Sequence, residues 1–336
     1  MINQMTMIVI PCCSIGTYAP TIVLFPLKED HPMKIRIVGA GALALVLSAT
    51  LTACGSSGGS DATGDTGKLN VVASTNVWGD IANQVGGSRI DVTSLLTSPD
   101  QDPHSFEANP KTALAISKAR VVIENGGGYD DYMDTLLKAS GSKATVINAV
   151  KVSGKTAPQG GELNEHVFYD FPTVKLMANT IAADLGKADP TYAAEFTKNA
   201  ATFNTSIDKL IDREGEIKTA AAGTPIAITE PVPLYMTAAV GLVNKTPAKF
   251  SEAIEEGDDM SATVLDETLA LYRDKKVKAL VYNEQTSGPV TEKVKAAAKR
   301  AGIAIVPVTE TLPTGDDYLE WMSSNLGALA TAVSKG

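Results

Sequence analysis

The feature that most constrains the fold of this chain is a long helical stripe in its middle. Between residues 190 and 222, apolar residues recur at helical spacing and no strand pattern interrupts them. At the helical rise this stretch of roughly 30 residues corresponds to about 45 Å, longer than an ordinary domain helix. A new strand pattern begins at Ile226, so we interpret the stripe as a rigid rod that joins two lobes. The alternative is a coiled-coil arm.

Short β-prone runs alternate with helical patterns on both sides of this rod. The expected strands are 69–74, 90–96, 121–125 and 145–147 before it, and 226–228, 246–250, 278–282 and 303–308 after it. Such alternation predicts parallel sheets covered by helices, with ligand-binding loops at the carboxyl ends of the strands. We therefore predict an α/β fold in which two Rossmann-like lobes, residues 68–189 and 223–336, are joined by one long rigid α-helix at 190–222.

Residues 33–53 have the organisation of a lipoprotein signal peptide. The basic segment Met33 to Arg36 precedes an apolar run from Ile37 to Leu47, which is too short to span a bilayer. The run closes on Leu51-Thr52-Ala53-Cys54, which resembles the lipobox of bacterial lipoproteins. The resemblance implies that Cys54 is lipidated on sulfur, as with palmitate, and becomes the new N-terminus.

This interpretation has consequences for the residues on either side of the signal peptide. Residues 1–32 become an upstream extension, and residues 54–67, which are mostly Gly, Ser, Asp and Thr, become a flexible tether. The mature chain then has no cysteine besides Cys54. We therefore expect no disulfide and no thiolate metal ligand, so any metal site must use nitrogen and oxygen atoms.

Charge and histidine content narrow the function further. The net charge is -9 and no basic stripe is found, which argues against nucleic acid and favours cationic ligands. Of the three histidines, His31 falls in the extension, which leaves His104 and His166, each in an expected loop. A lone histidine is more often a solvated residue than a ligand, but this pair has a recognisable context.

Two motifs give that context, Asp102-Pro103-His104-Ser105-Phe106-Glu107 and Asn164-Glu165-His166-Val167-Phe168. With them the chain resembles, over residues 68–336, the zinc- and manganese-binding receptor lipoproteins of bacterial ABC transporters. The first is similar to that family's Asp-Pro-His-x-aromatic-Glu motif, which implies that His104 is the first metal ligand. The second is similar to its Asn-Pro-His-Val-Trp motif and implies His166 as the second ligand, with a glutamate here in place of the usual proline.

The resemblance also implies two ligands from strand ends of the second lobe. Glu230 matches a position that is histidine in many zinc receptors and glutamate in many manganese receptors, and Glu310 matches one that is commonly aspartate. Glu284 is the reserve candidate. Any one of these glutamates, taken alone, is as often a solvated carboxylate. Two neutral imidazoles and two carboxylates would cancel a divalent charge in a cleft between the lobes, and four protein ligands suit holding an ion rather than activating water on it.

The function implied by the resemblance is metal capture without catalysis. The chain would be the extracytoplasmic substrate-binding component of an ABC importer, binding one Zn²⁺ or Mn²⁺ and delivering it to the permease and its ATPase. It would act as a monomer, anchored to the cell membrane through Cys54, with no nucleic-acid partner. Oxygen ligands suit manganese, but divalent affinity rises toward zinc, so the choice of ion stays open. The rod would limit lobe movement to a modest shift.

The sequence also leaves three alternative functions and one acidic segment to interpret. A surface adhesin is the first alternative. A metal-dependent hydrolase would need an open coordination position and a general base, and no His-Glu-x-x-His motif occurs. A receptor for an organic solute would need aromatic walls, yet Trp78 and Trp321 are the only tryptophans. We interpret the acidic run Glu255 to Asp259 as a solvated face.

Overall fold

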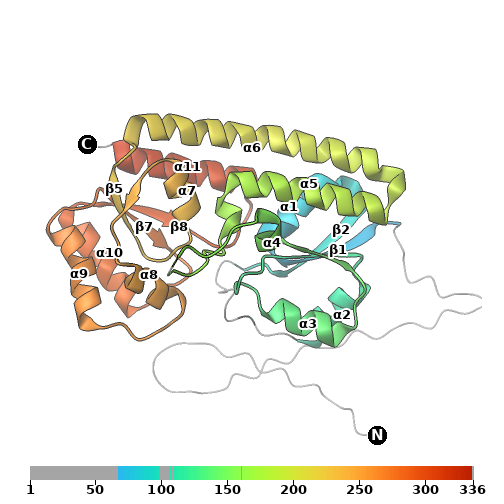
Figure 1. Cartoon of the computed structure of the whole chain (residues 1–336), viewed down its shortest axis with the longest axis horizontal. Coiled ribbons are helices and arrows are strands. Elements are labelled where there is room, and N and C mark those ends of the chain that lie inside the picture. The colour runs from blue at the N-terminus through green and yellow to red at the C-terminus, as the bar shows by residue number, and fades with distance from the viewer. Residues whose placement is uncertain (1–66, 99–105, 107–108, 160, 335–336) are drawn as a thin grey trace, which may run out of the picture. The chain divides into compact units, whose positions relative to one another are not determined.

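The computed structural model describes residues 67–98, 106, 109–159 and 161–334 (Figure 1). Residues 62–336 form one compact unit. The predicted signal peptide, residues 54–66 of the predicted tether with the candidate lipidation site Cys54, and the candidate ligand His104 lie outside the described residues.

The first sheet has four parallel strands in the order β2-β1-β3-β4. Alternate residues of its strands point to opposite faces, so neighbours in sequence enter different cores. Val72 and Val122 pack against one helical layer, whereas Val71 and Ile123 belong to the core on the other face. The strands are β1 (Leu69–Thr75), β2 (Ile90–Leu96), β3 (Val121–Glu124) and β4 (Thr145–Asn148), and the helices are α1 (Asn76–Gly86), α2 (Pro110–Lys118), α3 (Tyr132–Ser140), α4 (Ala149–Ser153) and α5 (Phe171–Ala188).

The second sheet repeats this topology with the order β6-β5-β7-β8, again parallel throughout. Ser261 caps α9, because its Oγ accepts a hydrogen bond of 3.3 Å from the Val264 backbone N–H. The strands are β5 (Pro225–Ile228), β6 (Val243–Asn244), β7 (Ala279–Asn283) and β8 (Ala304–Val308), and the helices are α7 (Leu234–Ala239), α8 (Ala248–Glu255), α9 (Ala262–Arg273), α10 (Pro289–Ala301) and α11 (Tyr318–Ser334).

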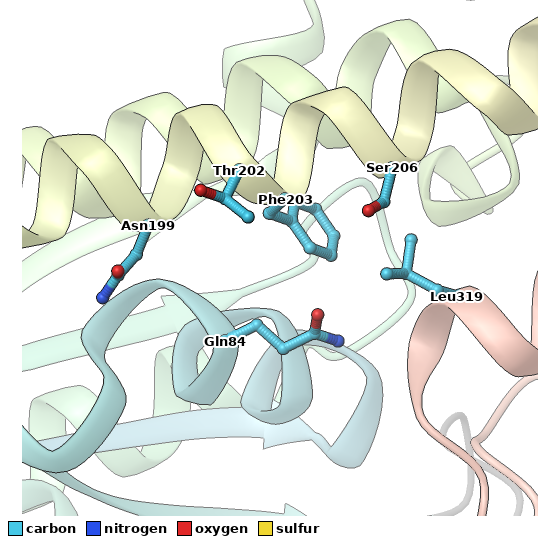
Figure 2. A pocket seen from close by; sticks show the side chains of 6 residues that line it. All are labelled: Gln84, Asn199, Thr202, Phe203, Ser206 and Leu319. Atoms are coloured by element: carbon cyan, nitrogen blue, oxygen red, sulfur yellow. The ribbon is translucent and has the colours of Figure 1, made fainter.

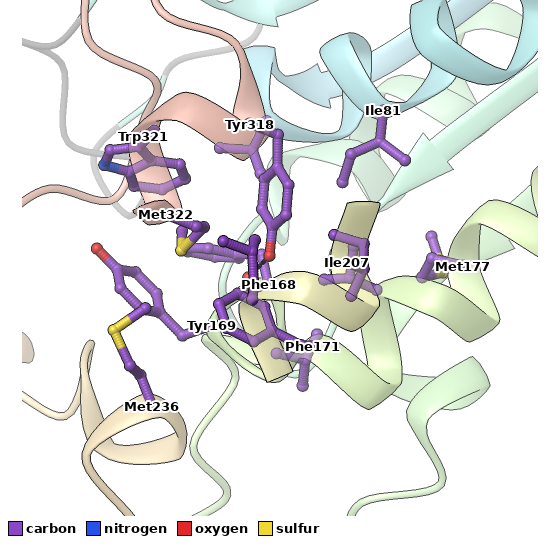
Figure 3. Packing of buried hydrophobic residues seen from close by; sticks show 14 of the residues in the cluster. Ile81, Phe168, Tyr169, Phe171, Met177, Ile207, Met236, Tyr318, Trp321 and Met322 are labelled. Carbon is purple, nitrogen blue, oxygen red and sulfur yellow. Dashed lines mark hydrogen bonds between the residues drawn. The ribbon is translucent and has the colours of Figure 1, made fainter. Parts of the chain in front are cut away.

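The predicted rod is the helix α6 (Ala193–Ala221), which has 29 residues. It lies along both halves of the unit and packs against α1, α5, α7 and α11 (Figure 1), so it is not a free coiled-coil arm. Its buried residues join one hydrophobic cluster that includes side chains of both sheets. Figure 3 shows Ile207 of this helix beside the aromatic side chains of Phe168 and Tyr318. Because packed cores resist continuous deformation, this shared core limits how far the two lobes can separate.

The predicted fold class is confirmed, while one local prediction is wrong. A strand was expected at 246–250, but the edge strand β6 comes earlier and Phe250 is buried within α8. Pro247 forms the N-cap of that helix, and proline's fixed φ favours a helix start over a strand. Helix α4 begins directly after β4, where the Asn148 side chain caps it by accepting a 2.9 Å hydrogen bond from Lys151 N–H.

Candidate metal centre

The carboxyl end of the second sheet brings three polar residues together. Glu230 comes two positions after β5, Asn283 ends β7, and Glu310 comes two positions after β8. These strands are neighbours in the sheet, with β7 between the other two. The residues are 2%, 1% and 4% exposed respectively. Parallel strands end at the same edge of a sheet, so the topology itself places two carboxylates and an amide side by side.

His166 approaches this edge from the first half of the chain, and Asn164 sets its tautomer. The Asn164 Nδ2 donates to the Pro231 carbonyl at 3.1 Å, and its Oδ1 accepts from the His166 backbone N–H at 3.1 Å. The amide orientation is therefore fixed, and Oδ1 also lies 2.8 Å from His166 Nδ1. Nδ1 must carry a hydrogen to donate to this oxygen. In the neutral ring, Nε2 then has the free lone pair that a metal requires.

That nitrogen faces a carboxylate at a spacing suited to a shared ion. His166 Nε2 lies 3.5 Å from Glu310 Oε2, which is longer than a hydrogen bond to a charged partner. Two ligands of one tetrahedral ion, each bonded at about 2.1 Å, are about 3.4 Å apart. The geometry therefore leaves room for a cation between His166 and Glu310.

Asn283 connects the two carboxylates. Its Nδ2 donates to Glu310 Oε1 at 2.7 Å and also to Glu230 Oε2. Glu230 Oε1 is buried and has no hydrogen-bond partner among the described residues. Burial, followed by the nearby Glu310 carboxylate, raises the pKa of Glu230 to about 7. A buried carboxylate with an unused oxygen is costly unless a proton or a cation compensates it.

The surrounding carboxylates also raise the pKa of His166. Burial alone would lower its pKa, but the carboxylates of Glu310, Glu165 and Glu255 outweigh burial and raise the pKa to about 9. When no metal is bound, this raised pKa favours the doubly protonated ring, whose second proton is on Nε2. A divalent ion that binds there must displace this proton, so metal binding releases protons.

The peptide that carries Glu310 is held from both lobes. Tyr169 OH donates to the Thr309 carbonyl at 2.7 Å, and Tyr129 OH donates to the Glu310 carbonyl at 3.3 Å. The Gln285 Oε1 accepts from the Glu310 backbone N–H at 2.5 Å. The backbone that carries the Glu310 carboxylate is therefore held in place, as a preorganised site requires.

Glu255 is the residue near the site that the sequence analysis misplaced. Its side chain is 8% exposed, and its Oε1 lies 3.6 Å from His166 Nδ1. Glu165, His166 and Glu255 together offer ligand atoms within 4.8 Å of one another. The prediction of a solvated face is wrong for Glu255, although residues 256–259 are exposed. Helix phase could have revealed this, because Glu255 lies four residues after the buried Ser251 on the same face of α8.

The other predicted ligands have different outcomes. The position of His104 is not described, but Phe106, two residues later, packs on the Tyr132 ring with centroids 4.5 Å apart. Glu284 is exposed, and its backbone N–H donates to the Val308 carbonyl at 3.0 Å. Among the described residues the structure therefore brings His166, Glu230 and Glu310 together and leaves Glu284 outside the group.

Two surface pockets lie apart from this group. One of about 160 Å³ is formed where α1, α6 and α11 meet (Figure 2), and it is lined by Gln84, Asn199, Thr202, Phe203, Ser206 and Leu319. The second, of about 330 Å³, includes Asn76, Asp80 and Asp316 in its wall. Neither of these two is lined by His166, Glu230 or Glu310. The candidate centre is instead enclosed by protein side chains, which suits the retention of a small ion.

Comparison with known proteins assigns this chain to a family. The family described as zinc-uptake complex component A, periplasmic, matches residues 71–332. The manganese-binding lipoprotein MntA of Bacillus subtilis is 31% identical over 179 residues, which cover 51% of this chain and 56% of that protein. The manganese ABC transporter substrate-binding lipoprotein PsaA of Streptococcus mitis is 25% identical over 309 residues, covering 85% of this chain and 95% of that protein.

Solved structures agree on the fold. The periplasmic zinc-binding protein TroA of Treponema pallidum aligns with a TM-score of 0.70 at 18% identity, covering 80% of this chain and all of that one (100%). A crystal structure of ZnuA aligns with a TM-score of 0.66 at 19% identity, covering 80% and 99%. At such identities the likeness shows the fold alone.

Proposed function

Because the chain belongs to the zinc-uptake complex component A family, we propose that it is the extracytoplasmic substrate-binding component of an ABC importer that captures a divalent zinc or manganese ion. The single observation that carries this proposal is the convergence of His166, Glu230 and Glu310. All three are buried, His166 Nε2 lies 3.5 Å from Glu310 Oε2, and the Asn283 amide donates to both Glu310 and Glu230.

We assign the ligands as His104, His166, Glu230 and Glu310. Two imidazoles and two carboxylates neutralise a divalent charge, so the ion can be held away from water at low electrostatic cost. With the ligands contributed by both lobes, the bound ion connects them, while the shared core under α6 keeps the accompanying movement small. The permease and its ATPase would then receive the ion from the loaded form.

The cellular location that we propose rests on the family and on the N-terminal segment of the chain. Relatives are named as lipoproteins of ABC transporters, which supports an extracytoplasmic place at the membrane. Within the described residues, no helix combines the length and apolar character that crossing a membrane would need. We propose that Cys54 carries the lipid anchor, that residues 54–67 are the tether, and that the protein acts as a monomer. Neither an adhesin nor a hydrolase is favoured by a specific feature of the described residues.

The proposal is tested by metal analysis of the full chain purified without chelator. We expect about one zinc or manganese per chain, and loss of that metal in the His104→Ala and Glu230→Ala variants. Glu284→Ala serves as the matched control, because this residue directly follows β7 at the same edge of the sheet but is exposed. Metal retained in the first two variants, or lost only in the control, would contradict the ligand assignment.

A further inference from the structure

Asn283 occupies the middle of the polar edge of the second sheet. It is the last residue of β7, and the strand order places β7 between β5 and β8. Glu230 and Glu310 follow these two outer strands. With the Asn283 side chain buried at 1% exposure, one amide group reaches both carboxylates from a fixed position.

The hydrogen bonds of Asn283 fix the orientation of its side-chain amide. Its Oδ1 accepts from the Gln285 backbone N–H at 3.2 Å, so its NH₂ group faces the carboxylates. That nitrogen donates to Glu310 Oε1 at 2.7 Å and to Glu230 Oε2, and the Thr286 hydroxyl lies 3.0 Å from it. The two hydrogens of one amide thereby engage one oxygen of each carboxylate.

Each of the two carboxylates has one oxygen that does not bond to the Asn283 amide. Glu230 Oε1 has no hydrogen-bond partner among the described residues, and Glu310 Oε2 is the oxygen that faces His166 Nε2. On the basis of the proposed metal-binding function, we propose that Asn283 is a positioning residue that restricts Glu230 and Glu310 to one metal bond each and so favours a four-coordinate ion, zinc, over manganese.

The chemistry of the two ions makes this restriction selective. Zinc is stable with four ligands in a tetrahedral arrangement. Manganese is a harder ion that prefers an octahedral set of oxygen ligands, which two bidentate carboxylates would approach. An amide that occupies the second oxygen of each carboxylate opposes that expansion. Second-sphere partners of this kind typically change metal affinity by about 10–100-fold.

The test is a measurement of zinc and manganese affinity on the full chain, by competition with a chelator, for the wild type, Asn283→Ala and Asn283→Ser. We expect Asn283→Ala to weaken zinc binding by about 10–100-fold and manganese binding by less, so that the preference for zinc falls roughly tenfold. Asn283→Ser retains one donor and should lie between the two. Glu284→Gln, which alters the exposed next residue, should match the wild type.

A second readout separates positioning from a purely structural role. Cobalt bound to the wild type should show the strong visible absorption of four-coordinate Co²⁺, and Asn283→Ala should weaken it as the coordination number rises. An equal loss of affinity for both metals with an unchanged cobalt spectrum, or no change in either affinity, would overturn the inference. If the wild type binds neither zinc nor manganese, the proposed function itself fails, which is a different result.

Discussion

The two sheets share one topology but use the carboxylates at their strand ends in different ways. In the first sheet, Glu124 accepts a 2.7 Å hydrogen bond from Asn148, and Asp130 accepts from two backbone N–H groups at 2.6 and 2.7 Å. In the second sheet, Glu230 and Glu310 share one amide donor, and Glu230 Oε1 has no hydrogen-bond partner among the described residues. The comparison teaches that the fold supplies polar strand ends, while the partner of each carboxylate decides whether it is structural or ligand-binding.

The loop after β3 shows why a carboxylate of the first sheet is structural. Gly126, Gly127 and Gly128 all have positive φ, at 76°, 78° and 104°, a conformation that side chains oppose and glycine permits. This path turns the N–H groups of Asn125 and Gly126 toward Asp130. Backbone N–H groups arranged in this way form an anion site, and here the chain fills it with its own aspartate.

The largest expected effect comes from removing a charge at the ligand-binding edge. Glu310→Gln should weaken zinc binding by roughly 100-fold, or about 2.7 kcal/mol, because it replaces an anionic ligand with a neutral amide that coordinates poorly. Isothermal titration of the full chain measures this. Glu124→Gln, at the corresponding edge of the first sheet, is the control and should bind zinc like the wild type. Equal losses of zinc affinity in the two variants would contradict the proposed difference between the edges of the two sheets.

An intermediate effect is expected at the structural edge, and on a different quantity. Asp130→Asn should lower the free energy of unfolding by about 1–3 kcal/mol, since it weakens charge-assisted bonds to buried backbone donors. Chemical denaturation measures the loss. The variant should still take up one metal per chain and gain stability when zinc is added. If it lost metal while keeping its stability, Asp130 would belong to the binding apparatus instead.

The smallest effect is expected for the stability of Glu124→Gln, which should stay within about 0.5 kcal/mol of the wild type near neutral pH. Burial, before other causes, raises the pKa of Glu124 above its usual 4.5. The folded state therefore binds the proton more tightly than the unfolded state, and this contribution is complete below pH 4.5 and is lost as the pH rises through the raised value. The uncharged variant avoids that loss.

Unfolding curves at several pH values check the sign. Relative to the wild type, Glu124→Gln should gain stability as the pH rises above 4.5. The opposite trend would mean that the Asn148 hydrogen bond, which lowers the pKa of Glu124, outweighs burial.

The sequence predicted the parts of this molecule that depend on local patterns. The stripe from Phe196 to Ile217 marked α6, and the alternation of strands and helices gave both sheets, because apolar periodicity is local. His166, Glu230 and Glu310 were proposed as ligands from the family resemblance, and that assignment stays a prediction. Residue spacing could not show that Asn283 lies between two carboxylates, since that depends on the order of strands in the sheet, β5-β7-β8.

Two further features depended on tertiary structure. The orientation of the Asn164 amide is set by Pro231, 67 positions away along the chain. Because this amide determines the tautomer of His166, the tautomer could not be predicted from the local motif. Adjacent acidic residues such as Glu255 and Glu256 look alike in sequence, yet α8 directs only the first toward His166. For Glu255 and Glu256, the deciding factor is which face α8 buries.

The most direct test of the central claim is an anomalous difference map from crystals of the full chain grown with zinc. The account predicts one strong peak at about 2.0–2.2 Å from His166 Nε2 and from one oxygen each of Glu230 and Glu310. A peak on the other side of the imidazole, between Nδ1, Glu165 and Glu255, or no peak near His166 at all, would contradict it.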